Sequence, residues 1–397
     1  MNRRSFLNAA AMMSVAPWQG PRPPTPAPTR DSGFDPWVEV KSAHLRQNVA
    51  AVSAGVGNRP ILAVIKNNGY GLGVVAIARI LAPLPQIRGL AVIKLQEAFA
   101  IRDAGITAPV LLMGPFEAAD LADLHARDIM PMVYTSIGSD LSRVAARGGR
   151  SIRIHVCIDT GLGRVGVPYR EAASLVKQLA GQSGVTIDGL MMTFSEDEAF
   201  DREQLRRFDL LHADLQQSGL STGLRHAASS YTFFQHPSIM LDMVRPGMAL
   251  FGVYPEPDFR KANRMPLTPS GALRARVAYV KKLAAGESAG YNRAYIAKVD
   301  TWVATLPVGH ADGWPRIAAK GARVRINGRH YPVIASVSAS HTIVEIGAEP
   351  AVHIGDVATL WDWEEGSRPE DVAVSCGASV YDLLMHLGGH LPRRVVD

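Results

Sequence analysis

Short apolar runs alternate with helical patterns over the first two-thirds of the chain. Between the runs, segments such as 74–82, 94–105 and 169–181 repeat apolar residues at helical spacing. Eight strands that alternate with helices predict a parallel (β/α)8 barrel of the TIM type, which we assign to residues 36–266. The eight strand-like runs are 61–65, 89–93, 109–113, 129–134, 152–158, 187–193, 225–228 and 248–252.

The pattern changes at about residue 267. Strand-like segments then follow one another, and helices are scarce before the last part of the chain. The segment "VRINGRHYPV" (324–333) carries Asn327-Gly328 between two strand patterns, a strong signal for a hairpin with a two-residue turn. Residues 267–397 are therefore expected to form a second, mostly β domain.

The first 35 residues read as an export signal followed by a linker. Arg3-Arg4 and a short uncharged apolar stretch resemble a twin-arginine signal. The stretch is too short for a stable membrane-spanning helix. Residues 17–30 are rich in proline and read as an extended linker. The sequence thus predicts export to the periplasm, with no stable membrane span.

Composition excludes several classes of function. The chain has 397 residues, 47% of them hydrophobic, so it can bury a large core. Its formal charge of +6 comes from interspersed acids and bases, without the basic stripe that nucleic-acid binding needs. Cys157 and Cys376 are the only cysteines, and two distant cysteines make neither a disulfide framework nor a zinc site. We therefore predict no nucleic-acid partner and no metal.

Polar residues follow the predicted barrel strands, where barrel enzymes carry their catalytic groups. A lysine, two arginines and a hydroxyl pair on one face indicate an anionic, phosphate-bearing ligand. A lysine in such a cation-rich, apolar pocket has a lowered pKa, as a Schiff-base lysine requires. Taken alone, Lys66 is equally consistent with an exposed surface lysine. The residues concerned are Lys66, Asp159, Arg164, Thr193, Ser229, Ser230 and Arg245.

The segment "AVIKNNGYGLG" (63–73) resembles the pyridoxal-phosphate lysine motif of the alanine racemase family. Five further segments resemble family blocks in the same order, and the similarity covers essentially the whole chain after residue 36. Members of that family consist of a barrel followed by a β domain, which agrees with the pattern above. The five segments are "CIDTGLGRVG" (157–166), "MVRPGMALFGVYP" (243–255), "ESAGYNRAY" (287–295), "LPVGHADGWPR" (306–316) and "VYDLL" (380–384).

The resemblance implies a racemase that uses pyridoxal 5'-phosphate and a two-base mechanism on a free amino acid, either alanine or a broader range. Lys66 would hold the cofactor and act as one base, and Tyr291 would act as the other. In the family this tyrosine reaches the active site of the partner subunit, so a homodimer with shared active sites is implied. The matching cofactor-binding positions are Lys66, Tyr70, Arg164, Ser230, Arg245, Gly247, Met248 and Tyr381.

Two arginines have specific implied roles. Arg245 matches the residue that faces the pyridine nitrogen and disfavours its protonation. Arg164 matches the residue that bonds the cofactor phenolate and faces the substrate carboxylate, and Tyr381 matches one that narrows the substrate pocket. Decarboxylases of this fold place a carboxylate opposite the pyridine nitrogen, so Arg245 argues against that activity.

The sequence departs from the family at several positions. Cys157 replaces a lysine, typically carbamylated, that orients the arginine, so Arg164 is expected to need an anion such as chloride nearby. Thr193 replaces a histidine that stacks on the cofactor. His310 and Ala339 replace a tyrosine and a methionine on the substrate side, which favours a roomier entrance, and Ser340 replaces an aspartate. These changes indicate either altered specificity or lost activity.

Several alternatives stay open at this point. One is another pyridoxal-phosphate enzyme of the fold, an epimerase or a decarboxylase, and another is a catalytically weak paralogue that binds cofactor or amino acid. The segment "GLGRVG" (161–166) fits a dinucleotide fingerprint, but its glycines precede the helix instead of opening it. The histidines of "HLGGH" (386–390) could pair on a metal, although two glycines weaken that helix. Asp312 beside His310 is expected to make a loop hydrogen bond.

Overall fold

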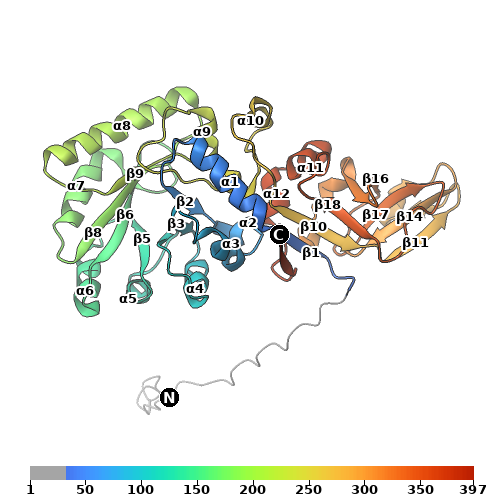
Figure 1. Cartoon of the computed structure of the whole chain (residues 1–397), viewed down its shortest axis with the longest axis horizontal. Coiled ribbons are helices and arrows are strands. Elements are labelled where there is room, and N and C mark those ends of the chain that lie inside the picture. The colour runs from blue at the N-terminus through green and yellow to red at the C-terminus, as the bar shows by residue number, and fades with distance from the viewer. Residues whose placement is uncertain (1–32) are drawn as a thin grey trace, which may run out of the picture. The chain divides into compact units, whose positions relative to one another are not determined.

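The structure is a computed structural model that describes residues 33–397. The expected twin-arginine signal and the proline-rich linker lie outside the described residues. Two large sheets organise the described chain, one parallel and curled, the other mostly antiparallel (Figure 1). This is the predicted fold class, a barrel of the TIM type followed by a mostly β domain.

Seven parallel strands follow one another around the first sheet in sequence order. They confirm seven of the eight predicted strands. β2 and β5 are buried along their whole length, as expected for parallel strands covered on both faces. The strands are β2 (Ile61–Val64), β3 (Ile87–Val92), β4 (Val110–Leu112), β5 (Ile129–Val133), β6 (Ile152–Asp159), β8 (Val185–Met191) and β9 (Leu224–His226), and the short β7 (Val167–Pro168) pairs with β6.

The eighth predicted strand, at 248–252, is wrong. Met248–Phe251 form a buried 3-10 helix, η2. The eighth side of the sheet is instead closed by residues 243–246, where Val244 makes a parallel bridge to Ile61. A short apolar run has the same pattern in a buried strand and in a buried helical turn, so periodicity alone placed the strand too late in the chain.

Helices connect the strands and surround the curled sheet (Figure 1). The predicted helical segments 74–82, 94–105 and 169–181 form α3, α4 and α7. The helices of this part are α1 (Ser42–Gly55), α2 (Lys66–Tyr70), α3 (Val74–Leu81), α4 (Leu95–Asp103), η1 (Ala118–Asp120), α5 (Leu121–Ala126), α6 (Gly138–Gly148), α7 (Tyr169–Ala180), α8 (Glu198–Gln217), α9 (Ser230–Gln235) and α10 (Pro257–Ala262).

The second sheet has nine strands in the order β11-β14-β17-β16-β15-β18-β10-β1-β19. The predicted hairpin is present, because Ile326 pairs with Arg329 and the two turn residues both have positive φ. The strands are β1 (Trp37–Lys41), β10 (Gly271–Arg276), β11 (Tyr279–Leu283), β14 (Thr301–Leu306), β15 (Arg323–Ile326), β16 (Arg329–Ile334), β17 (Thr342–Gly347), β18 (Val357–Trp361) and β19 (Arg393–Val396), and a separate pair comprises β12 (Ser288–Ala289) and β13 (Tyr295–Ile296).

Strands from both ends of the described chain meet in this sheet. β1 pairs antiparallel with β10 and parallel with β19. The remaining short elements are η3 (Tyr291–Arg293), η4 (His310–Asp312), η5 (Arg316–Lys320), α11 (Pro369–Cys376) and α12 (Val380–Met385). None of the helices within residues 33–397 is long and apolar enough to span a bilayer.

Candidate active site

A cavity of about 400 Å³ lies at the carboxyl ends of the barrel strands. It brings together every residue that the sequence assigned to the cofactor, although these residues are far apart in the chain. The helix α12 contributes one of them, so the second half of the chain completes the cavity. The lining includes Lys66, Tyr70, Arg164, Ser230, Arg245, Gly247, Met248 and Tyr381.

Lys66 stands where β2 ends and a left-handed turn begins. The four residues after it, 67–70, all have φ between 53° and 62°. Asparagine and glycine tolerate this conformation better than other residues, which explains the sequence Asn-Asn-Gly after the lysine. Asn68 N–H donates to the Glu97 carboxylate at 2.7 Å, and Asn68 Oδ1 accepts from Val74 N–H at 3.0 Å. The turn therefore fixes the lysine and delivers Tyr70 to the same cavity.

The charge environment of Lys66 is the one expected for a reactive lysine. Burial and the nearby Arg164 lower its pKa, while Glu97 opposes them. Tyr70 is buried, and burial together with Tyr381 raises the pKa of its phenol above the usual range. At neutral pH Tyr70 is thus a hydroxyl donor. The sequence analysis had predicted that the pKa of this lysine is lowered.

Ser230, Gly247 and Tyr70 form a compact hydroxyl and amide corner. Ser230 Oγ accepts from Gly247 N–H at 3.0 Å and from Ala249 N–H at 3.2 Å, so its own proton is free to be donated. A Cβ at position 247 would lie 2.0 Å from the Tyr70 hydroxyl oxygen. Only glycine fits there, and this close approach lets the two loops share one corner of the cavity.

Arg245 is buried and anchors a chain of polar groups that the sequence did not reveal. Its Nη1 donates to His226 Nδ1 at 3.0 Å, and His226 Nε2 lies 2.8 Å from His155 Nδ1. Burial lowers the pKa of both histidines, that of His155 to about 4 and that of His226 well below its ordinary value. Both rings are therefore neutral. Because Arg245 can only donate, His226 carries its proton on Nε2 and donates it to His155.

Burial lowers the pKa of Arg245 to about 10, so the guanidinium keeps its charge at neutral pH. Its Nη2 donates to Met192 O at 2.8 Å and to Thr193 Oγ1 at 3.3 Å. Thr193, which stands where the family has a histidine, is thus a direct partner of the buried arginine.

Cys157 and Arg164 lie at the end of β6 and in the loop after it. Burial raises the pKa of the Cys157 thiol to about 11, so this side chain is neutral and gives Arg164 no countercharge. Asp159 Oδ1 accepts from the N–H groups of Gly161 and Gly163 at 2.9 and 3.1 Å and so shapes the loop. Within residues 33–397 no hydrogen bond or ion pair engages the exposed Arg164 guanidinium, which leaves it available to a ligand.

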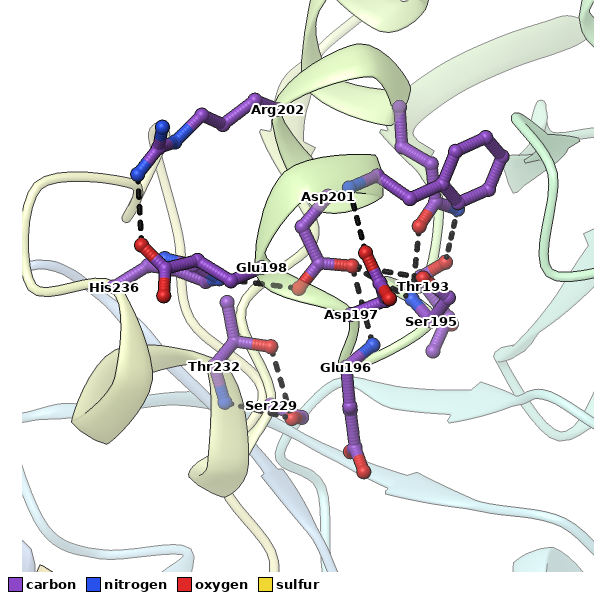
Figure 2. A network of polar contacts seen from close by, with 12 residues as sticks. Thr193, Ser195, Glu196, Asp197, Glu198, Asp201, Arg202, Ser229, Thr232 and His236 are labelled. Atoms are coloured by element: carbon purple, nitrogen blue, oxygen red, sulfur yellow. Dashed lines mark hydrogen bonds and ion pairs between the residues drawn. The ribbon is translucent and has the colours of Figure 1, made fainter.

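Glu196 also lines the cavity, and sequence reasoning missed it. It has φ of 69°, and its N–H donates to Asp201 Oδ1 at 3.1 Å. Asp201 is buried and hydrogen-bonds Ser195 and His236 as well (Figure 2). A side chain of α8 thus fixes the segment that precedes this helix. The acidic "SEDE" run (195–198) was the only sequence signal, and such a run usually reads as a solvated surface.

Three predicted residues do not line this cavity. Tyr291 lies on η3 with 73% of its surface exposed, and Ala339 is exposed as well. His310 Nε2 lies 2.9 Å from Arg316 Nη2. The structure of one chain therefore does not bring Tyr291 to Lys66, and the predicted role of Tyr291 in a partner's site stays a prediction.

Asp312 makes the loop hydrogen bond that was expected, accepting from Gly309 N–H at 2.8 Å. Its other oxygen lies 2.8 Å from His390 Nε2. His390 is thereby tied to a loop carboxylate, while His386 follows α12 on an exposed turn. Across the described residues, no three His, Cys, Asp or Glu side chains gather as a metal site requires.

Comparison with known proteins places both halves of the chain in one family. Residues 40–255 match the family model for the alanine racemase N-terminal domain, and residues 271–395 match the model for the alanine racemase C-terminal domain. The alanine racemase of Desulforamulus reducens is 31% identical over 364 residues, covering 90% of this chain and 98% of that protein. The one from Clostridium perfringens is 33% identical over 365 residues, covering 90% and 94%.

Solved structures agree in fold. Alanine racemase from D-cycloserine-producing Streptomyces lavendulae superposes with a TM-score of 0.85 at 28% identity, covering 92% of this chain and 98% of that one. Alanine racemase from Bacillus anthracis with bound L-Ala-P gives a TM-score of 0.82 at 28% identity, covering 94% and 96%.

Proposed function

The chain belongs to the alanine racemase family, and we propose that it interconverts L- and D-amino acids with pyridoxal 5'-phosphate as cofactor. One observation carries this proposal: a single cavity gathers a lysine of lowered pKa, two arginines and the hydroxyl corner.

The residues present fit the cofactor. Tyr70 and Ser230 supply hydroxyl donors for a phosphate, next to the backbone of Gly247 and Met248. Lys66 supplies the amine that holds an aldehyde, and its lowered pKa makes the neutral, nucleophilic form more available. When bound, pyridoxal phosphate withdraws electrons from the substrate and so makes the Cα–H bond acidic.

The chain's own groups then determine the outcome. Lys66 Nζ takes or delivers a proton on one face of Cα. Arg245 stays charged despite its burial, and facing the pyridine nitrogen of a bound cofactor it would disfavour protonation of that nitrogen and so favour return of the proton to Cα. Arg164 has no partner within residues 33–397 and is free to bind the substrate carboxylate.

We propose that Tyr291 is the second base and acts in the site of a partner subunit, within a homodimer. The exposure of Tyr291 and its absence from the cavity of its own chain support this. Mixing inactive Lys66→Ala and Tyr291→Phe subunits tests it. Heterodimers then contain one intact site, and activity should return to about a quarter of the parent's. Failure of the mixture to regain activity, with heterodimers detected by native mass spectrometry, would contradict shared sites.

We also propose that the protein is exported to the periplasm and acts there on free amino acids. The support is the twin-arginine-like segment in the sequence. Cell fractionation of the parent and of an Arg3→Lys/Arg4→Lys variant measures export, which the variant should lose. Chiral analysis of culture supernatant from a strain lacking the gene should show changed D-amino-acid levels.

The direct test of the reaction is incubation of the cofactor-loaded protein with individual L-amino acids in D2O. Cα–H exchange and chirality are followed together. Exchange with inversion supports a racemase, and exchange without inversion means that the Lys66 side works while the Tyr291 side does not. Absence of exchange with every amino acid would overturn the proposal.

A further inference from the structure

The cavity contains one charged residue for which the proposed reaction has no use. Among the described residues that line it, three are cations, Lys66, Arg164 and Arg245, and Glu196 is the sole carboxylate. The cations have their tasks toward the cofactor and the substrate carboxylate. Glu196 would repel both a phosphate and a carboxylate, so it cannot share those tasks.

The backbone of Glu196 is held in place by buried groups. Asp201 is 1% exposed, and its carboxylate accepts from Ser195 N–H at 3.0 Å and from Glu196 N–H at 3.1 Å. Gln204 is fully buried, accepts from Ser195 N–H at 2.8 Å and donates to Thr193 O at 3.1 Å. These bonds hold Glu196 at φ of 69°, a conformation that glutamate adopts only when its surroundings impose it.

The Glu196 side chain points away from this network (Figure 2). Within residues 33–397 neither of its carboxylate oxygens makes a hydrogen bond or an ion pair. Its acidic neighbours differ: Asp197 caps α8 by accepting from Phe200 N–H at 2.9 Å, and Glu198 pairs with Arg202 at 2.7 Å. Among the acidic residues 196–198, Glu196 is thus the one whose carboxylate has no protein partner within the described residues and is available to a ligand.

The chemistry of an amino acid leaves one partner for this carboxylate. The α-carboxylate is repelled by Glu196 and attracted by Arg164, and the α-amino group is the one that reacts with the cofactor. Only the side chain varies among amino acids and remains unassigned. A carboxylate favours a cation in that position, and it disfavours an acidic side chain.

We propose that Glu196 binds the cationic side chain of a basic amino-acid substrate such as lysine, ornithine or arginine. This inference rests on the proposed racemase function and adds a substrate class to it. Glu196 is exposed to solvent in this chain, and partial desolvation together with the nearby Asp201 and Glu256 raises the pKa of its carboxyl group. Arg164 lowers that pKa but lies beyond ion-pair distance, so it does not neutralise the glutamate.

The test compares L-lysine with L-norleucine, which has the same chain without the ammonium group. For the cofactor-loaded parent we expect kcat/KM for Cα–H exchange to favour lysine by about tenfold or more. In Glu196→Gln that preference should fall by about tenfold, while exchange of alanine changes by less than about threefold. Glu196→Lys should disfavour lysine relative to norleucine.

Glu198→Gln is the matched control, because it removes the same charge from a residue two positions after Glu196. The Glu198 side chain pairs with Arg202 and does not line the cavity. It should keep the parent's preference. Titration of the cofactor absorbance with each amino acid gives Kd values independently of turnover, and the same pattern is expected there.

The outcomes separate the two proposals. Exchange of alanine with no preference for lysine over norleucine overturns the role of Glu196 and leaves the racemase proposal intact. A preference that Glu196→Gln retains overturns it as well. Absence of exchange for every amino acid contradicts the racemase proposal, and the Kd values then decide on Glu196 alone.

Discussion

At the scale of single residues, burial has opposite effects on the ionisable groups of the cavity. It lowers the pKa of Lys66 toward the neutral amine, whereas it raises the pKa of Cys157 and so holds the thiol neutral. Arg245 loses part of its basicity but stays charged, with a pKa of about 10. One apolar environment thus yields a nucleophilic amine, an inert thiol and a permanent cation.

The lysine shift can be measured. Burial comes first among its causes and Arg164 second, so replacing Arg164 by glutamine should raise the pKa of Lys66 toward its ordinary value of 10.5. The pH dependence of pyridoxal uptake by the cofactor-free protein, trapped by borohydride and read from the Lys66 peptide, reports this midpoint. Arg170→Gln, at an exposed position of α7, should leave it unchanged. An identical midpoint in parent and Arg164→Gln would contradict the assignment.

At the scale of elements, the segment between β8 and α8 depends on one buried carboxylate. Asp201 accepts from Ser195 and Glu196 and pairs with His236 Nε2 at 3.1 Å (Figure 2). Removing it leaves Glu196 N–H, the Ser195 hydroxyl and the His236 imidazole without this partner. The N–H of Ser195 keeps its bond to Gln204 Oε1. The segment that positions Glu196 is therefore held by a side chain of α8, and not by contacts among its own residues.

Asp201→Ala should lower the free energy of unfolding by about 3 kcal/mol, because several bonds to buried groups are lost together. Asp197→Ala removes only the bond from Phe200 N–H that caps α8, and should cost about 1 kcal/mol. Urea denaturation measures both, and limited proteolysis between residues 193 and 197 reports local opening. Equal losses in the two variants would show that Asp201 acts as no more than a local cap.

Most helices and strands could be predicted from the sequence, because the patterns that indicate them are local. The alternation of strands and helices identified the barrel, and Asn327-Gly328 identified a hairpin turn. It failed at Met248–Phe251, where a buried 3-10 helix has the same apolar pattern as a strand. It also missed His226, because a lone histidine in a strand carries no signal until the fold places it against Arg245.

The candidate site was also predictable only where local sequence patterns identify its residues. The resemblance to a family located Lys66 and its partners, because those residues sit in recognisable blocks. Glu196 lies outside them, and its position depends on contacts with a helix that begins two residues later in the chain. Long-range packing decides where such a side chain points, and no local pattern encodes it.

At the scale of the whole molecule, the last strand supports the turn that carries the lysine. Arg393 begins β19, which pairs with β1. Its guanidinium donates to Gly71 O at 2.9 Å, directly after the left-handed turn, and to Gly388 O at 2.8 Å. The C-terminal strand and the loop behind Lys66 are therefore joined by one side chain.

Replacing Arg393 by alanine should lower the free energy of unfolding by about 2 kcal/mol, because partly buried carbonyls lose a charged donor. It should also speed release of bound pyridoxal phosphate, since the turn after Lys66 loses its support. Arg393→Lys keeps the charge but not the planar fork that reaches two carbonyls, so it should recover less than half of the loss. Urea denaturation and the rate of cofactor release measure the two effects, with Arg147→Ala on the exposed face of α6 as control. If Arg393→Ala matched that control in both measurements, the C-terminal strand would have no part in holding the lysine turn.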